Sequence, residues 1–272
     1  MRTKLQGAGI GLRRKHFKEI LETSRRIDWL EIIPENYMGY GGRPSRQIDE
    51  CRERWAIAGH GVALSLAGPD PLDTDYLAKV EAISQRVEAP WFSEHLSFAR
   101  VHGLQTHDLV PLPFNRDATR WVVSRIRRVQ AALARPFLVE NVSFYAVMPG
   151  SDMHELDFLA AVLEEADCGL MFDVNNLYVN SRNHGYDPFA ALDRIPLHRA
   201  RQIHLAGHRD EGDVIIDDHG SAVCEDVWAL YRETIRRAGP IPTLIEWDAN
   251  LPTLDRLLDE ADRARAILEE AG

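Results

Sequence analysis

Five apolar segments of this 272-residue chain are each followed at once by acidic or histidine side chains. The ends of these segments read Ser93-Glu-His-Leu-Ser, Glu140-Asn-Val-Ser, Asp173-Val-Asn-Asn, His204-Leu-Ala-Gly-His and Glu246-Trp-Asp. Carboxylate oxygens and imidazole nitrogens are the groups that bind catalytic metal ions and transfer protons. Their recurrence at the same place in successive segments predicts metal-assisted or acid–base chemistry at one shared site.

Four carboxylates, those of Glu140, Asp173, Asp217 and Glu246, are expected to point into one cavity. Two carboxylates about 5 Å apart repel each other by roughly 3 kcal/mol at an effective dielectric near 20. All four therefore stay ionised together only if cations lie between them. Neutral imidazole ligands are available nearby from His60, His95, His204 and His219. Mixed imidazole and carboxylate ligation without cysteine indicates a catalytic site for Fe, Mn or Zn.

Each of these residues also has an ordinary structural explanation when it is taken alone. His95 could be a buried histidine with its hydrogen bonds satisfied, Asp173 could cap the turn that follows it, and Glu246 could pair with an arginine. His16, His154 and His198 fall within or beside helical patterns and are expected to be solvated. The metal hypothesis depends on the strand-end residues being considered as a set.

A scaffold that brings these ends together can be predicted from the apolar pattern. The expected strands are Ala8–Leu12, Trp29–Ile33, one within Ile57–Leu66, Trp91–Ser97, Phe137–Val142, Gly169–Val174, Gln202–Ala206 and Thr243–Trp247. The expected helices are Lys15–Arg26, Arg46–Ile57, Asp75–Val87, Arg116–Ala134, His154–Glu165, Pro188–Ile195, Cys224–Arg237 and Leu254–Leu268. Continuously apolar strands are typical of a parallel sheet buried on both faces. Eight strand–helix repeats predict one α/β domain over residues 1–272, a single (β/α)8 TIM barrel with its site at the carboxyl ends of the strands.

Three longer connections, Met38–Pro44, Ala99–Asn115 and His208–Val223, all follow predicted strands. They are therefore expected on the face of the barrel where such enzymes build their sites. Long connections in a compact barrel are usually functional or mobile.

Composition limits the partners and the compartment of the protein. Lysine and arginine total 32 against 42 acidic residues, a formal charge of −10, which disfavours nucleic acid as a partner. No apolar run approaches the roughly 18 residues that cross a membrane, and Met1–Gly7 lacks the apolar region of a signal peptide. The three cysteines show no CxxC spacing and are expected to be reduced. These features predict a cytoplasmic protein with no membrane contact.

Longer motifs surround the candidate ligands. They include His60-Gly-Val-Ala-Leu-Ser, Phe172-Asp-Val-Asn-Asn-Leu-Tyr-Val-Asn, Asn183-His-Gly, Ile203-His-Leu-Ala-Gly-His and Ile245-Glu-Trp-Asp. With the strand ends at Ser93 and Glu140, these seven motifs resemble, in order, the multinuclear non-haem iron-dependent oxidative enzymes. The resemblance covers nearly the whole chain, about Gly7 to Leu268. The spacing of the ligands also resembles the xylose-isomerase-like barrels, in particular the trinuclear metal arrangement of endonuclease IV.

The resemblance implies a ligand set when the motifs are matched residue by residue. One iron would be held by His60, His95 and Glu140, and a second by Glu140, Asp173, His204 and Glu246, with Glu140 bridging. The third would be held by Asn176, Asp217 and His219. Asn176 stands where the endonuclease pattern has histidine, so the third site is expected to be the weakest. Residues beside these ligands in the motifs would hydrogen-bond the ligands or contact the substrate, namely Asn141, Asn175, His184 and His208.

The resemblance also implies an activity. The family oxidises ribosomally made precursor peptides with O2, often at cysteine, and usually acts with a small partner protein that recruits the peptide. The expected cofactor is two to three iron ions of mixed Fe(II) and Fe(III) state, with O2 as co-substrate. The modified residue could also be aspartate or another residue. Two alternatives stay open: a metal-dependent hydrolase or isomerase of the endonuclease IV or xylose isomerase type, and a non-catalytic binding barrel.

Overall fold

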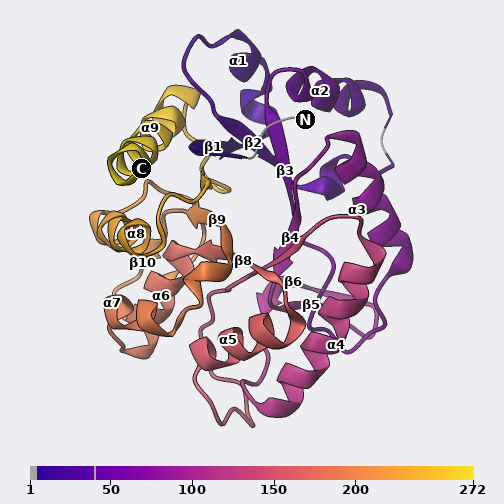
Figure 1. The fold of residues 1–272 in the computed structure, drawn as a ribbon, viewed down its shortest axis with the longest axis vertical. Helices are drawn as coiled ribbons and strands as arrows, with labels where there is room; N and C mark the ends of the chain where they lie inside the picture. The colour runs from indigo at the N-terminus through magenta and orange to yellow at the C-terminus, as the bar shows by residue number, and fades with distance from the viewer. Residues whose placement is uncertain (1–4, 40) are drawn as a thin grey trace.

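The centre of the protein is a closed barrel of eight parallel strands (Figure 1), seen in a computed structural model that describes residues 5–39 and 41–272. The order around the barrel is β1-β12-β9-β8-β7-β4-β3-β2. The strands are β1 (Ala8–Gly11), β2 (Trp29–Ile32), β3 (Ala56–Gly61), β4 (Phe92–His95), β7 (Phe137–Glu140), β8 (Gly169–Asp173), β9 (Ala200–Leu205) and β12 (Thr243–Ile245). The predicted (β/α)8 barrel is confirmed. Met1–Lys4, within the segment that was predicted to lack a signal peptide, and residue 40, within Met38–Pro44, lie outside the described residues.

Helices form a ring outside the strands (Figure 1). The α-helices are α1 (Phe17–Glu22), α2 (Gly42–Arg52), α3 (Thr74–Arg86), α4 (Arg116–Ala132), α5 (Glu155–Ala166), α6 (Val174–His184), α7 (Pro188–Ala191), α8 (Glu225–Ala238) and α9 (Leu254–Ala271). Short 3-10 helices are η1 (Arg14–His16), η2 (Pro34–Asn36), η3 (Leu192–Arg194) and η4 (Leu197–Arg199). Several α-helices begin at a side-chain cap: Asp73 accepts a hydrogen bond from the Tyr76 amide, and Asn115 accepts one from the Ala118 amide. None of the helices in the described part of the chain is long and apolar enough to cross a membrane.

The barrel interior below the carboxyl ends of the strands is filled by large apolar side chains. Trp29, Trp91, Leu138 and Met171 pack together in a cluster of buried residues that is separate from the main core between strands and helices. A Cβ atom on Gly9 would lie 2.4 Å from the Trp29 ring, so only glycine lets β1 approach this ring. These apolar side chains fill one end of the barrel interior, and the polar side chains of Gln202 and Glu31 lie between them and the carboxyl ends of the strands.

The connection after β8 differs from the prediction. The sequence predicts a helix only at Pro188–Ile195, but α6 already begins at Val174, directly after the strand. Asp173 caps it, because one of its carboxylate oxygens accepts a hydrogen bond from the Asn176 amide at 2.6 Å. Asparagine and β-branched valine have poor helix propensity, so tertiary burial of the helix decides its formation here. As a result, Asn175 and Asn176 lie on the first turn of a helix rather than in a loop.

Two of the predicted long connections contain small antiparallel hairpins. The connection after β4 forms β5 (Phe98–Val101) and β6 (Leu104–Val110), and the connection after β9 forms β10 (Arg209–Asp210) and β11 (Ile215–Ile216). The tip of the first hairpin is held down by Asp70, whose carboxylate accepts hydrogen bonds from the His102 and Gly103 amides. Both hairpins follow strands of the barrel, at its carboxyl-terminal end.

Candidate metal centre

The candidate ligands come from the ends of six neighbouring strands. His95, Glu140 and Asp173 are the last residues of β4, β7 and β8, and the other three are His60 near the end of β3, His204 near the end of β9 and Glu246 directly after β12. Parallel strands present their carboxyl ends at one rim of the barrel, so these six side chains converge. In the β4–β7 pair His95 lies opposite Glu140, and in the β8–β9 pair Asp173 lies opposite His204.

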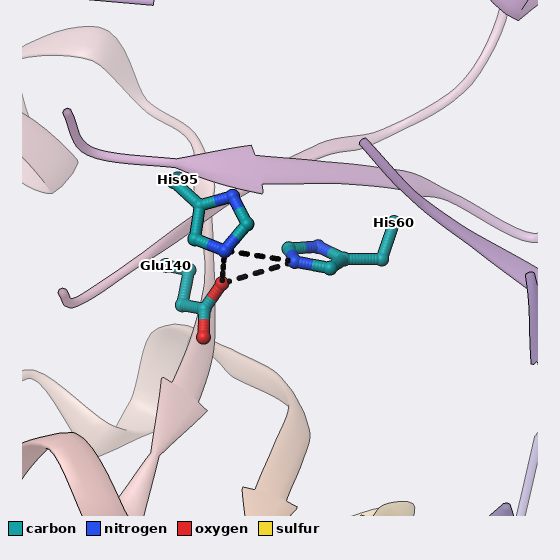
Figure 2. Close-up of side chains that lie close together, drawn as sticks. All are labelled: His60, His95 and Glu140. Carbon is teal, nitrogen blue, oxygen red and sulfur yellow. Dashed lines mark hydrogen bonds and ion pairs between the residues drawn. The ribbon is translucent and has the colours of Figure 1, made fainter. Parts of the chain in front are cut away.

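His60, His95 and Glu140 form the tightest group (Figure 2). The Nε2 atoms of both histidines lie 3.2 Å from the same Glu140 oxygen, Oε2, and 3.3 Å from each other. All three side chains are largely removed from solvent. Three potential ligand atoms therefore meet at one point.

The far nitrogens of these imidazole rings are held by other residues. Ser93 Oγ donates to the Gly59 carbonyl and so accepts a hydrogen bond from His60 Nδ1, at 3.0 Å. His95 Nδ1 donates to the Glu94 carboxylate at 3.1 Å. Both Nδ1 atoms carry the proton in this assignment, and both Nε2 lone pairs face Glu140. Such an arrangement, with a carboxylate or hydroxyl behind the imidazole, is the usual support of a metal-binding histidine.

A second group shares Glu140 with the first. Ligand atoms of Glu140, Asp173, His204 and Glu246 all lie within 4.8 Å of one another. His204 Nδ1 is 2.9 Å from Glu246 Oε2 and 4.0 Å from Glu140 Oε1. The two oxygens of Glu140 thus face different groups, which is the geometry a bridging carboxylate needs.

Glu31 on β2 contacts His204 from the side away from the second group, and the sequence analysis missed it. Its carboxylate lies 3.2 Å from His204 Nε2, on the ring edge opposite Glu246. Gln202 also donates to Glu31, at 2.5 Å, and is itself oriented by a hydrogen bond from Trp91 Nε1 to its Oε1. A lone carboxylate within the apolar strand Trp29-Leu-Glu-Ile was the available signal. The Gln202 amide nitrogen lies 2.8 Å from the same His204 Nε2, so Glu31 and Gln202 together hold this edge of the ring while Nδ1 faces Glu246.

The third predicted group is partly assembled. His219 Nε2 lies 2.8 Å from Asp217 Oδ1, yet this nitrogen makes no hydrogen bond, so the pair has the spacing of two ligands of one cation. Asn176 Nδ2 donates to the Asn141 carbonyl, and its Oδ1 is buried without a partner. His219 also lies 3.3 Å from Glu246 and 3.7 Å from Asp248, a neighbour that the sequence analysis did not single out.

The four residues predicted beside the ligands have different surroundings. Asn141 exchanges two hydrogen bonds with the backbone of Asp173, and Asn175 donates to Asp217 Oδ1 at 2.8 Å. His208 donates to the side-chain oxygen of Asn175 at 2.8 Å, so this pair supports Asp217 from behind. His184, at the end of α6, hydrogen-bonds the Phe144 carbonyl and stacks on the Phe144 ring.

The electrostatics of the groups favour bound cations. Burial would raise the pKa of Glu140, but the surrounding histidines, His95 foremost, lower it below its usual value. Burial lowers the pKa of His95, but Glu140 and Glu94 outweigh it and raise this pKa to about 9. Burial and the charge of Glu140 raise the pKa of Asp173 well above its usual value. The carboxylates thus attract positive charge, which protons or metal ions can supply.

Unsatisfied atoms test whether the residues fit a metal. Of the ten buried side-chain N and O atoms without a hydrogen-bond partner in the described part of the chain, four belong to predicted ligands. These four atoms are Glu140 Oε2, Asp173 Oδ2, Asn176 Oδ1 and His219 Nε2. An unpaired buried polar atom costs about 1–3 kcal/mol, which metal coordination would remove. The donor set, imidazole nitrogen with carboxylate and amide oxygen, fits a catalytic transition-metal site.

A cavity of about 250 Å³ opens over the groups, and His60, His95, Glu246 and Leu109 of the β5–β6 hairpin are among its lining residues. A larger cavity of about 610 Å³, lined by residues such as Trp91 and Ile241, contains none of the candidate ligands. The smaller cavity is the relevant one, since barrel enzymes carry their sites at the carboxyl ends of the strands.

Solved structures define the class of protein. The chain is similar to a xylose isomerase-like TIM barrel protein from Mycobacterium smegmatis in complex with magnesium, with a TM-score of 0.62, 14% identity and coverage of 98% and 97% of the two chains. It is also similar to D-psicose 3-epimerase from Clostridium cellulolyticum H10, with a TM-score of 0.58, 11% identity and coverage of 98% of each chain. At these identities the likeness shows the fold alone. The protein has the fold of a xylose-isomerase-like TIM barrel and carries potential metal-binding clusters at its strand ends.

Sequence comparison gives the family. Residues 7–269 match the family described as RiPP precursor modification enzyme MbnB/TglH/ChrH, whose members act on ribosomally made precursor peptides. A UPF0276 protein of Anaeromyxobacter sp. (strain Fw109-5) is 48% identical over 264 residues, covering 97% of this chain and 93% of the relative. A UPF0276 protein of Pseudomonas aeruginosa (strain PAO1) is 44% identical over 270 residues, covering 98% and 94%. The chain belongs to the MbnB/TglH/ChrH family of multinuclear non-haem iron-dependent oxidative enzymes, as the resemblance predicted.

Proposed function

We propose that this enzyme uses iron and O2 to oxidise a ribosomally synthesised precursor peptide, with cysteine as the favoured modified residue and aspartate as an alternative. The observation that carries the proposal is the convergence of His60 Nε2, His95 Nε2 and Glu140 Oε2 within 3.3 Å, with Glu140 shared by a second group. The absence of cysteine among these ligands favours a catalytic site for Fe, Mn or Zn over a structural zinc site, and iron is chosen among these metals because of the family. Family membership supports the peptide substrate.

The residues fit two or three metal ions. His60, His95 and Glu140 would hold the first ion, and Glu140, Asp173, His204 and Glu246 the second. Asn176, Asp217 and His219 would hold the third and weakest. When bound, iron would supply electrons to O2 and a binding position for a substrate thiolate or carboxylate.

The protein's own contribution is orientation and the control of protons. Ser93 and Glu94 hold the far nitrogens of His60 and His95, so both rings turn a lone pair toward the site. Glu31 and Gln202 hold the far edge of the His204 ring. Ser143 and Asn175 donate to the two oxygens of Asp217 and hold this carboxylate toward His219. Burial of the groups limits water at the reacting position.

The alternative function is that of a metal-dependent hydrolase or isomerase. The epimerase relatives share the fold at only 10–15% identity, and fold alone does not transfer an activity. The formal charge of −10 disfavours a nucleic-acid substrate.

The metal content of the protein tests the proposal. Aerobically purified protein is expected to contain two to three irons per chain and to be coloured by charge transfer to ferric iron. Elemental analysis and the visible spectrum measure both. Stoichiometric zinc, with activity restored by zinc alone, would overturn the assignment of iron.

Recruitment of the peptide by a small partner protein is the second part of the proposal. The cavity of about 250 Å³ over the groups is too small to bind a whole precursor peptide. We place the docking site near the connections Ala99–Asn115 and His208–Val223, which carry the two hairpins. We also place the reaction in the cytoplasm, where free cysteines such as Cys51, Cys168 and Cys224 stay reduced.

Turnover of a candidate precursor, with and without the protein encoded beside it, tests recruitment. A partner that holds the peptide at the barrel raises its effective concentration, so we expect turnover at low peptide concentration to rise about 100-fold or more. Modification by the barrel alone at the full rate, unchanged on adding the partner, would show that recruitment is built into this chain.

A further inference from the structure

A second cavity lies beside the one that covers the candidate metal centre. Its volume is about 590 Å³, and it is lined by residues after β1, after β2 and on α2. Arg13, Ile33 and Asp248 line both cavities, so the two are neighbours that share a wall. In Figure 1, α2 lies beside the strands β1 to β3. We call the second cavity the side groove.

The wall of the side groove is basic in an otherwise acidic protein. Three consecutive residues, Arg13, Arg14 and Lys15, line it. α2 contributes Pro44 and Gln47 to the lining and also carries two exposed arginines, Arg43 and Arg46, in the same turns. The chain as a whole has a formal charge of −10, so this local cluster of positive side chains is opposite in sign to the net charge of the protein.

The acidic residues in the lining do not neutralise this wall. Asp248 is paired with Arg13, and their ion pair forms part of the shared wall. Glu35 directs one oxygen toward the Tyr76 hydroxyl and the Val62 and Ala63 amides, which hydrogen-bond it. Burial raises the pKa of Glu35, and the hydrogen bonds hold its carboxylate away from Arg14 and Lys15.

Arg14 and Lys15 are left available for a ligand. Arg14 is exposed, and its side chain has neither an ion pair nor a hydrogen bond among residues 5–39 and 41–272. Lys15 is exposed, and its Nζ donates to the Leu251 carbonyl, which leaves its charge without a carboxylate partner. Two positively charged side chains without a carboxylate partner thus lie at the side groove, next to the cavity that covers the candidate metal centre, which we call the reactive cavity.

We propose that the side groove binds an acidic segment of the peptide whose reactive residue lies at the metal centre. The inference rests on the proposed function, since it requires a peptide substrate. A chain that enters the small reactive cavity must leave it over the shared wall or an equivalent rim, and the side groove offers room of the size of a ligand pocket. Arg14 and Lys15 would select carboxylates there and set the direction of the chain, because complementary charge favours one register over others.

Equilibrium binding of two defined peptides tests the inference. The probes are fluorescein-labelled hexaglutamate and hexaglutamine, measured by fluorescence anisotropy on the metal-loaded protein. The test variant is Arg14→Glu/Lys15→Glu. The matched control is Arg128→Glu/Arg232→Glu, which makes the same change in net charge at exposed arginines of α4 and α8, outside the groove lining. Both variants change exposed residues, and thermal unfolding verifies their folding.

Wild-type protein should bind hexaglutamate more tightly than hexaglutamine, and added salt should reduce the difference. The test variant should bind hexaglutamate about tenfold more weakly, while the control variant stays within about twofold of wild type. Equal losses in the two variants would show a general charge effect and overturn the proposal. Unchanged binding by the test variant would place the glutamates elsewhere, for example on the metals. Displacement of hexaglutamate by inorganic phosphate at matched ionic strength would show a small-anion site instead.

These outcomes can be separated from failure of the oxidase proposal. Binding is measured without O2 and without turnover, so a protein that fails to oxidise its peptide can still bind hexaglutamate through Arg14 and Lys15. Conversely, an active oxidase with no preference for hexaglutamate over hexaglutamine would contradict peptide binding in the side groove and would leave the proposed oxidase function unaffected.

Discussion

Glu140→Ala is expected to lose at least two bound metals and nearly all activity, whereas His219→Ala should lose at most one metal. Glu140 Oε2 lies 3.2 Å from the Nε2 atoms of His60 and His95, and Oε1 faces His204 at 4.0 Å. Loss of Glu140 therefore weakens both groups at once. His219 is a predicted ligand of the third metal alone, although it also lies near Glu246 and Asp248.

The activity of Glu140→Ala should fall by more than about 100-fold, the upper cost of mutating a residue that merely supports a metal ligand. Metal content by elemental analysis and turnover of the precursor measure the two effects. Glu140→Gln is the second variant, because it keeps the side-chain volume and removes only the charge and the bridging capacity. Similar metal content in purified Glu140→Ala and His219→Ala proteins would contradict the bridging role of Glu140.

The barrel could be predicted because its signal is local and repeated. Each parallel strand is buried on both faces and therefore appears in the sequence as a short apolar run, such as Phe137–Glu140 or Gly169–Asp173. The polar residue that ends each run is exceptional within its segment, which is why His95, Glu140 and Asp173 could be found without coordinates. The structure places all three in the groups that the metal hypothesis requires.

The ordinary explanations of single residues turned out to be compatible with the metal hypothesis. Asp173 does cap α6 with one oxygen, and its other oxygen is buried without a partner. Glu246 does lie near an arginine, Arg13 at 3.7 Å, while its second oxygen is 2.9 Å from His204. A carboxylate has two oxygens and can serve both roles, so arguments from one contact cannot exclude the other.

Other features depend on contacts that no local pattern records. α6 was missed because its helical form is decided by burial against the rest of the barrel and not by propensity. Glu31 was missed because it lies on β2, a strand with no other polar ligand, and becomes relevant only through contact with His204. The prediction that His16 is solvated is wrong: it is fully buried and hydrogen-bonds the Pro252 carbonyl, far away in sequence.

Oxidation of a precursor peptide by reconstituted enzyme tests the central claim most directly. Metal-free protein is loaded anaerobically with Fe(II) or with Zn(II) and mixed with the candidate precursor and the partner protein encoded nearby. Half of each sample is then exposed to O2, and the mass of the peptide is measured. The proposed iron-dependent oxidase predicts a change in peptide mass only with iron and O2 together, because electrons must pass from the substrate to O2 through a redox-active metal. The same product with zinc, or with iron in the absence of O2, would contradict an iron-dependent oxidase and point to hydrolysis or isomerisation on this barrel.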